Sequence, residues 1–323
     1  MAQRTYWHLE GLGRVPSDYD LATSRLLYYP ERGFAVDTPV SAWYAKHQTG
    51  SALRLADWEA FRDPRETTYA AYTALQDRAQ VFVDGLYRAG GDDYDRSLEA
   101  GWVGSLERVL PVLLYPCHAL QMLAAYVGQM APAGRVVIAS LFQAADEMRR
   151  TQAFAYRTRL LARAFPHFGH EAKRGWQELP EWQPLRRTLE RMLVAYDFGE
   201  AFVALCLALK PRFDRFVESA LASAARQNDD PLLEKLVFSL AEDSSWHRAW
   251  SHELVRLAVR NDAGQRHVIE SWLSRWEPQV RESLAALDAL LAPDPDEGDR
   301  LDRIEARCRE DGRGVGLFVE EVS

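Results

Sequence analysis

Two short polar stretches interrupt apolar helical runs and contain the residues best suited to ligate a metal ion. In "ADEMRRTQ", residues 145–152, Glu147 is followed three positions later by Arg150. Residues three apart share one face of a helix, and a Glu followed by a His at this spacing is a metal-ligand pair in helical bundles. A guanidinium has only N–H donors and no lone pair to offer a cation. The stretch therefore has ligand spacing with one ligand replaced by a positive charge.

The second stretch is "EDSSWH", residues 242–247, in which His247 is preceded at i−3 by Ser244. An apolar stripe at helical spacing runs through Leu233, Leu240 and Leu254 and places Ser244 and His247 on the buried line. Because no carboxylate stands three residues before the histidine, the simpler interpretation is a core His that is hydrogen-bonded to a neighbouring helix. Metal ligation is the alternative.

Glu147 and Arg150 share a helix face and can form an ion pair. The pair is either solvated or buried inside a bundle. A buried Glu costs several kcal/mol unless it is paired, so a buried arrangement would need the guanidinium as its counter-charge. The sequence leaves both arrangements open.

Few other donors are available on the preceding helical runs. "LYPCHAL" supplies Cys117 and His118 without an acid, and "AYDFGEAF" supplies Asp197 and Glu200. A dinuclear iron site in a helical bundle needs a carboxylate from each of two helices and a Glu-x-x-His pair from each of two more. This set has too few anionic oxygens to hold two irons.

The spacing of apolar residues predicts an all-α protein. Six helical segments are expected, several broken by Pro or Gly, and no convincing β-alternation or glycine-rich phosphate loop is present. The segments are 62–87, 101–131, 136–165, 185–227, 229–260 and roughly 264–291. Asp230 followed by Pro231 is a strong helix-start signal.

Composition excludes several classes of function. The chain has 323 residues, a net charge of −8 and no long block of like charge, which argues against nucleic-acid binding through a basic surface. Its three cysteines are far apart and form no CxxC pair, so neither a disulfide framework nor a zinc cage is expected. No signal peptide or membrane-length apolar run is found, and we expect a cytoplasmic protein.

Both ends of the chain differ from the predicted bundle at 56–292. Residues 1–55 form an irregular arm rich in turn formers and aromatics, including Trp7, Tyr19, Tyr28, Tyr29 and Trp43. Disordered segments are normally poor in aromatics, so the arm either packs on its own domain or lies on a partner. Residues 293–323 form a charged tail, expected to be loosely packed or to dock only through its apolar "VGLFV" end.

Nearly the whole chain resembles a known family, the β subunits of the hydroxylase component of bacterial multicomponent diiron monooxygenases, of the toluene, alkene and isoprene type. The resemblance is carried by "TYWHLEGLGRVPSDYDLATSRLLYY", by "WYAKHQTGSALRLADWEAFRDPRETTYAAY", and by the altered motifs "DEMRR" and "EDSSWH". The fold it implies is a ferritin-like helical bundle, like that of the ribonucleotide reductase small subunit, without an intact diiron site.

In the catalytic α subunits of that family both motifs read D-E-x-R-H. By resemblance, Arg150 then stands in place of the first His and Ser244 in place of the second Glu, while Glu147 and His247 remain. Cys117 falls near the first helix's carboxylate, and Glu200 near that of the third. The six positions are thus altered ligand positions, with no metal, catalytic or cofactor-binding residue expected in this chain.

The resemblance implies a non-catalytic structural subunit of an NADH-dependent oxidoreductase of hydrocarbon catabolism. The complex would hydroxylate aromatic hydrocarbons or epoxidise alkenes with O2, the diiron centre residing in the α subunit. Expected partners are that subunit, a small γ subunit in an α2β2γ2 heterohexamer, an effector protein, and a ferredoxin and reductase. The five arm aromatics named above are the interface candidates.

Two other functions fit the sequence less well. One is a stand-alone metal-binding ferritin-like oxidase that uses Glu147, Glu200 and His247. The other is a helical ligand-binding regulator, for which the chain offers no DNA-reading helix with a basic face.

Overall fold

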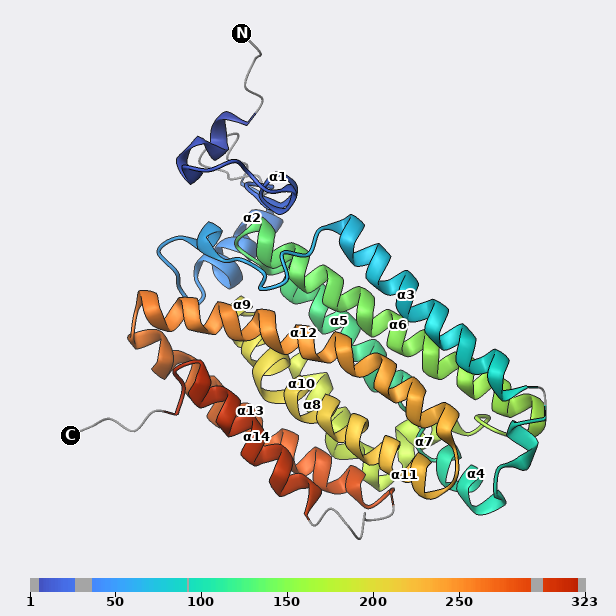
Figure 1. The fold of residues 1–323 in the computed structure, drawn as a ribbon. Helices are drawn as coiled ribbons and strands as arrows, with labels where there is room; N and C mark the ends of the chain where they lie inside the picture. The colour runs from blue at the N-terminus through green and yellow to red at the C-terminus, as the bar shows by residue number, and fades with distance from the viewer. Residues whose placement is uncertain (1–5, 27–36, 92, 292–298, 319–323) are drawn as a thin grey trace.

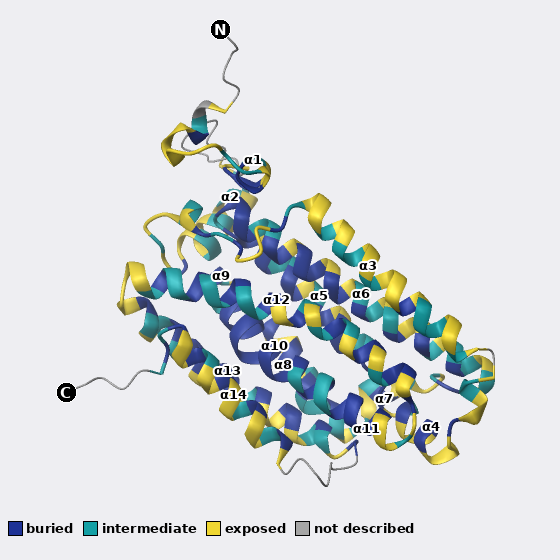
Figure 2. Cartoon of the chain, viewed as in Figure 1, coloured by how far each residue is buried: buried dark blue, intermediate teal, exposed yellow. Residues whose placement is uncertain are grey.

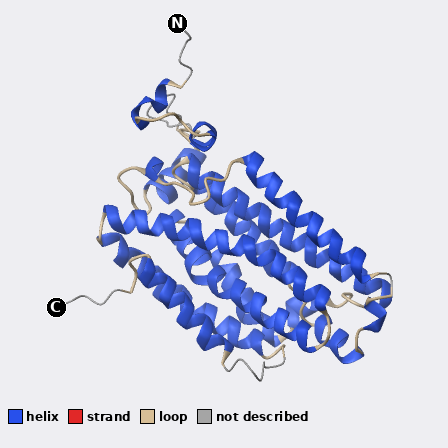
Figure 3. Ribbon diagram, viewed as in Figure 1, coloured by secondary structure: helices blue, strands red, loops and turns tan. Residues whose placement is uncertain are grey.

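The computed structural model describes residues 6–26, 37–91, 93–291 and 299–318, and every regular element within these ranges is a helix (Figure 3). The predicted all-α class is confirmed. The principal helices of the bundle are α3 (Tyr69–Gly90), α4 (Ala100–Glu107), α5 (Leu114–Met130), α6 (Gly134–Ala164), α7 (Ala172–Glu178), α8 (Gln183–Met192), α12 (Pro231–Asn261), α13 (Gly264–Asp288) and α14 (Arg300–Gly314). No helix in the described part of the chain combines the length and apolar character needed to cross a bilayer.

The long helices lie side by side and bury their facing sides, while their outer sides are exposed (Figures 1 and 2). α6 and α12 match the predicted runs 136–165 and 229–260 to within two residues at each end. α12 begins as expected, because the Asp230 side chain accepts a hydrogen bond from the Leu233 N–H at 3.0 Å. Both polar stretches therefore lie near the middle of long helices, inside the bundle.

The predicted helix over 185–227 is instead interrupted. α8 ends at Met192, and the chain resumes at α9 (Phe198–Phe202), followed without a break by η7 (Val203–Leu209), α10 (Lys210–Phe216), η8 (Val217–Leu221) and α11 (Ala222–Gln227). The η7 and η8 segments are π-helical turns.

Pro211 explains the first π-helical turn. A proline inside a helix has no N–H, and its ring collides with the carbonyl four residues before it. The buried Arg212 guanidinium satisfies the released carbonyls, donating from Nη1 to Leu207 O at 3.2 Å and to Ala208 O at 3.0 Å. The changed helical register then decides which side chains of α10 face the bundle interior.

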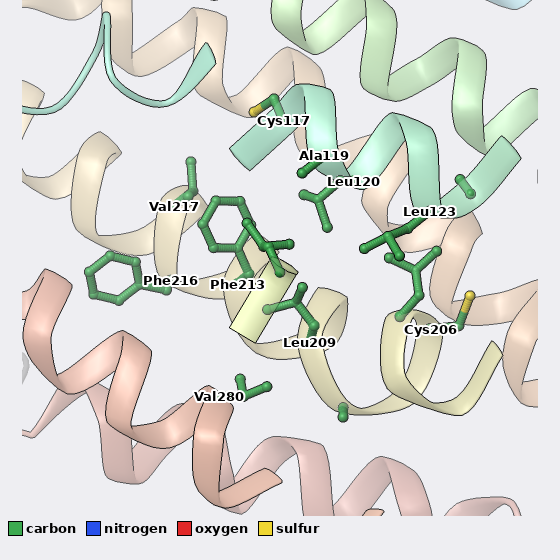
Figure 4. Packing of buried hydrophobic residues seen from close by; sticks show 14 of the residues in the cluster. Cys117, Ala119, Leu120, Leu123, Cys206, Leu209, Phe213, Phe216, Val217 and Val280 are labelled. Atoms are coloured by element: carbon green, nitrogen blue, oxygen red, sulfur yellow. The ribbon is translucent and has the colours of Figure 1, made fainter. Parts of the chain in front are cut away.

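An apolar layer fills the space beneath this region. Leu120 and Leu123 on α5 face Leu209 and Phe213 on the η7–α10 segment (Figure 4), and all four are buried. Close packing of this kind allows little relaxation, so a polar group nearby must find its partners among the side chains around it.

The predicted loose tail is corrected for residues 300–314, which form α14. The helix packs along α10, because the buried Arg212 donates to Glu305 at 2.8 Å and Arg215 forms an ion pair with Asp311. Leu317, in the apolar end that was expected to dock, is also buried. The charges of the tail serve as ion-pair partners for arginines of the bundle, which is why they do not prevent docking.

His252 on α12 lies near this junction, and it makes stability depend on pH. Burial lowers the pKa of His252 from its usual 6.5 to about 4; Asp311 opposes this shift, and nearby arginines add to it. The folded chain thus keeps His252 neutral while the unfolded chain takes up a proton below about pH 6.5. We expect this group to reduce the free energy of unfolding by up to about 1.4 kcal/mol per pH unit between pH 6.5 and 4.

The measurement is urea unfolding of the wild type and of His252→Gln from pH 8 to pH 4.5. The variant should lose stability less steeply below pH 6.5 and match the wild-type slope above pH 7. Parallel curves over the whole range would show that His252 does not contribute.

The N-terminal segment projects beyond one end of the bundle (Figure 1). It includes η1 (Trp7–Leu12) and α1 (Asp18–Thr23) and is followed by α2 (Pro39–Tyr44) and η3 (Ala45–Thr49). Tyr19 was an interface candidate, but it is buried in its own chain: Arg62 and Arg135 lie 5.4 Å and 5.6 Å from its ring centre, and its hydroxyl accepts from the Asp63 N–H at 3.0 Å. This part of the arm packs on its own bundle, which corrects the expectation for Tyr19.

The other arm aromatics are placed differently. Tyr28, Tyr29 and the side chain of Trp7 lie outside the described residues. Trp43 is 38% exposed and contacts the rings of His47 and Tyr196, with centroid distances of 4.4 Å and 4.9 Å. Of the five candidates, Trp43 is the one whose described side chain is available on the surface.

Candidate functional site

The Glu147–Arg150 pair lies on α6 inside the bundle. Arg150 Nη1 is 3.4 Å from Glu147 Oε2, and the two side chains are 5% and 0% exposed. This settles the alternatives that the sequence left open, because a solvated pair on the outer face would be accessible. The chain buries both charges.

Helix α10 adds a second pair of charges at this point. Lys210 and Asp214 are four residues apart on one face of the helix, and both are buried. Lys210 Nζ bonds to Glu147 Oε1 and lies 2.9 Å from Asp214 Oδ2 and 3.2 Å from Asp214 Oδ1. One ammonium group therefore joins carboxylates of two helices.

Arg150 completes the cluster by reaching in two directions. Its Nη1 donates to Asp214 Oδ1 at 2.7 Å, and its Nη2 donates to Ser244 Oγ on α12 at 2.6 Å. Two carboxylates, Glu147 and Asp214, face two cations, Lys210 and Arg150. The charges in this buried charge cluster balance, as a buried set must if it is not to cost several kcal/mol per unpaired ion.

The electrostatic shifts agree with this arrangement. Burial alone would raise the pKa of Asp214, but Arg150 and Lys210 outweigh it and hold this pKa far below its usual value. Burial would lower the pKa values of Lys210 and Arg150, but Asp214 and Glu147 raise both. Lys210, Arg150 and Asp214 are therefore charged at neutral pH.

His247 lies beside the cluster and is oriented by an acid. Its Nε2 is 2.9 Å from Asp146 Oδ2, while Asp146 Oδ1 accepts from the Tyr72 hydroxyl at 2.7 Å and from Gln76 Nε2 at 2.8 Å. Burial, and next Lys210, push the pKa of His247 well below 6.5, so the ring is neutral. A hydrogen-bonded core His was the simpler interpretation, and it describes these contacts.

The corresponding acid of the second stretch, Asp243, lies at the edge of the bundle with its side chain 14% exposed. Asp243 pairs with Arg149 at 3.2 Å and accepts from Gln76 Nε2 at 3.1 Å. These side chains line a pocket of about 40 Å³ at the surface between α3, α6 and α12. The pocket has room for only a few waters.

The structure brings five of the six altered ligand positions into one region and separates the sixth. Glu147, Arg150, Ser244 and His247 meet as described, and Cys117 on α5 is buried close enough for Arg150 to influence it. Burial raises the pKa of the Cys117 thiol to about 12, so it is protonated.

Glu200 does not join the cluster, which corrects its predicted placement. It lies in the first turn of α9 and accepts from Arg275 Nη1 at 2.7 Å and Trp276 Nε1 at 3.2 Å, both on α13. The helix start at the Asp197 cap and the later π-helical turns change the register that an uninterrupted helix would have. Lys210, ten residues further on and roughly 15 Å along the axis, occupies the interior instead.

Lys210 and Asp214 were missed, although the sequence contained a signal. "VALCLALKPRFDRF" places a Lys and an Asp at i, i+4 inside an otherwise apolar run. Such residues are almost never fully buried unless they are paired. That spacing identifies a buried ion pair, but the helix with which it pairs could not be read from the sequence.

The donor set does not fit a pair of metal ions. No group of three or more His, Cys, Asp or Glu side chains able to hold a metal is found within the described ranges. Arg150 has no lone pair to donate, and Lys210 Nζ occupies the space between the two carboxylates that could otherwise bridge ions.

Comparison with known proteins relates this geometry to a family. Residues 41–262 match the family model described as methane/phenol/alkene hydroxylase. The chain is similar to the hydroxylase component subunit beta of the toluene-4-monooxygenase system of Ectopseudomonas mendocina, with 34% identity over 299 residues that cover 90% of this chain and 91% of the relative.

Two solved structures are similar in fold. One is toluene 4-monooxygenase with toluene bound in the resting active site, with a TM-score of 0.85, 33% identity, and coverage of 91% of this chain and 99% of that one. The other is xenon-pressurised phenol hydroxylase from Pseudomonas sp. OX1, with a TM-score of 0.88 and coverage of 100% and 98%. At 19% identity, the second shows the fold alone.

Proposed function

The chain belongs to the methane/phenol/alkene hydroxylase family, as a β subunit of a diiron monooxygenase hydroxylase, and from this we propose that it is a structural subunit whose partner holds the iron. The proposal is supported most by Lys210 and Arg150, because two cationic side chains occupy the interior at the level where metal ligands would converge. The role of the chain is then to fold without metal and to support the iron-bearing subunit.

The pattern of replacements supports the same proposal. At the two altered positions the substitutes contact each other, since Arg150 Nη2 donates to Ser244 Oγ at 2.6 Å. His247 keeps the carboxylate partner that orients metal-ligating histidines in general, here Asp146. These contacts are those of a metal site converted to an internal ion-pair network.

The complex proposed for this chain contains an α subunit with the diiron centre and a small γ subunit, as α2β2γ2, served by an effector protein, a ferredoxin and a reductase that draws on NADH. Its substrates are aromatic hydrocarbons, which it hydroxylates, or alkenes, which it epoxidises. The name of the toluene-4-monooxygenase relative supports the aromatic class.

The stand-alone oxidase has no support from the geometry. It would need Glu147, Glu200 and His247 to converge, but Glu200 bonds to Arg275 and Trp276 on α13. For the ligand-binding regulator, none of the contacts described above offers support.

The test is a titration of activity. The iron-loaded α and γ subunits are held at fixed concentration with reductase, ferredoxin, effector protein, NADH and toluene, and this chain is added. Activity should rise until the chain and the α subunit are equimolar, and this chain alone should oxidise no toluene. Turnover by the chain alone, or full activity in its absence, would contradict the proposal.

Trp43 is proposed as an anchor of the α–β contact. Aromatic side chains that are exposed in a free subunit often become binding hot spots, each worth about 1–3 kcal/mol or more. Trp43→Ala should raise the concentration needed for half-maximal activity in this titration by roughly tenfold or more. Tyr69→Ala, which removes an aromatic that is 73% exposed on α3, is the matched control. If Trp43→Ala and Tyr69→Ala raised the concentration for half-maximal activity equally, Trp43 would not be a specific anchor of the α–β contact.

A further inference from the structure

A surface cavity of about 670 Å³ lies where α3 and α6 both end, beside the start of α12 (Figure 1). Four arginines line it, together with one acid, two tyrosines and three apolar side chains. We propose that this cavity binds a small organic phosphate, with the phosphate group at Arg88, Arg157 and Arg163 and an apolar or aromatic body against the tyrosine rings. Cavities of this volume are typical of small-molecule sites.

The first support is the charge of the cavity walls. The lining acid, Asp95, is already paired with Arg157, and the fourth arginine pairs with Asp93 at 2.8 Å. Arg88 and Arg163 are exposed and have no ion-pair partner among the described residues. The walls therefore carry a net positive charge made of guanidinium groups, whose forked donors match the oxygens of a phosphate.

The second support is independent of net charge and concerns Arg157, at the floor of the cavity. Its side chain is 0% exposed, and its Nη1 donates to Asp95 Oδ1. Its Nε and Nη2 have no hydrogen-bond partner among the described residues, since the Asp230 Oδ2 atom is 3.7 Å from Nη2, beyond hydrogen-bond distance. Buried donors without acceptors are rare, and an oxyanion in the cavity supplies acceptors for both.

Tyr87 supplies a further unmatched donor. Its hydroxyl is buried without a hydrogen-bond partner in the described part of the chain. Burial raises the pKa of Tyr87, although Arg157 opposes the shift, so the hydroxyl stays protonated and can donate. The Tyr87 ring packs edge-on against that of Tyr156, with centroids 5.0 Å apart, so the wall beside the guanidinium groups is aromatic.

The number of donors favours a phosphate over a carboxylate. Two N–H groups of Arg157, the Tyr87 hydroxyl and the guanidinium groups of Arg88 and Arg163 are more than two carboxylate oxygens engage. A phosphate monoester offers three acceptor oxygens and about two negative charges at neutral pH. The aromatic wall suits a phosphate that carries an apolar body.

Helix dipoles account for only part of this arrangement. Arg88 and Arg163 stand in the last turns of α3 and α6, where a cation is favourable in any helix. That preference does not explain why Arg157 and Tyr87 keep unmatched buried donors on the same cavity. Arg157 also lies two turns of α6 beyond Arg150, outside the buried charge cluster, so binding here is additional to the proposed structural role and does not depend on it.

The experiment titrates the full-length chain with inorganic phosphate, phenyl phosphate and benzoate at constant ionic strength, by isothermal titration calorimetry. We expect one site per chain, with phenyl phosphate bound roughly fivefold more tightly than phosphate and tenfold more tightly than benzoate. No binding of phenyl phosphate by the folded chain, or binding no tighter than that of the other two probes, would overturn the proposal.

An exposed arginine tests the location. Arg163→Gln removes a guanidinium that has no ion-pair partner among the described residues, so it should fold as the wild type does and bind phenyl phosphate roughly tenfold more weakly. Arg159→Gln is the matched control, because Arg159 is exposed one turn earlier on the same helix and does not line the cavity. Equal affinities of the two variants would overturn the proposal, since surface charge in general would then explain the binding.

Tyr87→Phe tests the buried donors. Because the hydroxyl has no partner in the described part of the free chain, its removal should not lower the Tm measured without ligand. The same change should weaken the binding of phenyl phosphate by roughly fivefold. A lower Tm together with unchanged affinity would show that the hydroxyl serves the fold, which contradicts its assignment to the ligand.

Discussion

Arg150→Met is expected to lower the free energy of unfolding by about 3–5 kcal/mol, because it leaves buried acids without their counter-charge. Arg150 reaches Asp214 at 2.7 Å, Ser244 at 2.6 Å and Glu147 at 3.4 Å, and its side chain is 5% exposed. Methionine fills much of the same space, so most of the loss is electrostatic. For a chain of this size the change corresponds to roughly 4–7 °C in Tm.

Arg149→Met is the matched control, one position along the same helix. Arg149 pairs with Asp243 at 3.2 Å at the edge of the surface pocket and donates to Ser239 O at 3.1 Å. We expect a loss of about 1 kcal/mol for this partly accessible pair. If both changes lowered the free energy of unfolding equally, the buried charge cluster would contribute no more to stability than the partly accessible pair of Arg149 and Asp243.

A second change should recover part of the loss. Asp214→Asn introduced into Arg150→Met removes one anion as well as one cation, so the double variant should be more stable than the single one. Double-mutant cycles measure this coupling directly, and we expect a coupling energy of about 1–3 kcal/mol. Additive effects would show that Asp214 and Arg150 do not act as a pair.

Arg135→Met is expected to release the N-terminal segment from the bundle. Arg135 is buried at the start of α6 and donates to Glu59 O at 2.7 Å, Ser24 Oγ at 2.8 Å and Thr23 Oγ1 at 3.2 Å. Its guanidinium also lies 5.6 Å from the centre of the Tyr19 ring. Charged hydrogen bonds of this kind contribute about 1.5–3 kcal/mol each when broken singly, so their joint loss should open residues 6–26 locally.

Limited proteolysis and hydrogen exchange measure the opening. Amides in α1 should exchange at least tenfold faster in Arg135→Met, while those of α5 and α12 remain protected. Arg14→Met is the control, because Arg14 is 47% exposed and makes a single 2.7 Å ion pair with Asp20. Unchanged protection of α1 in Arg135→Met would show that other contacts hold the segment.

The sequence was sufficient for the fold class and for the long helices. Apolar residues at helical spacing located α6 and α12, and the Asp230–Pro231 start was placed correctly. The apolar stripe placed Ser244 and His247 on the buried line of α12, and the spacing of Glu147 and Arg150 put them on one face of α6, although whether that face is buried stayed open. These features depend on local periodicity, which a sequence states directly.

Features that depend on register or on distant partners could not be predicted. The resemblance placed Glu200 near a ligand position, but its carboxylate bonds to α13. Lys210 and Asp214 face the cluster instead. Tyr19 belongs to an aromatic segment of the kind found at interfaces, yet Arg62 and Arg135 of the same chain pack against its ring. The aromatic content of a segment does not reveal whether the surface that covers it belongs to the same chain.

The most direct test of the central claim is anomalous scattering at the iron absorption edge from crystals of the assembled hydroxylase. We predict a pair of iron peaks in the partner subunit and none between α6, α10 and α12 of this chain, where the Lys210 ammonium should remain bonded to Glu147 and Asp214. Iron peaks that bridge Glu147 and Asp214, with Lys210 and Arg150 turned away, would contradict it.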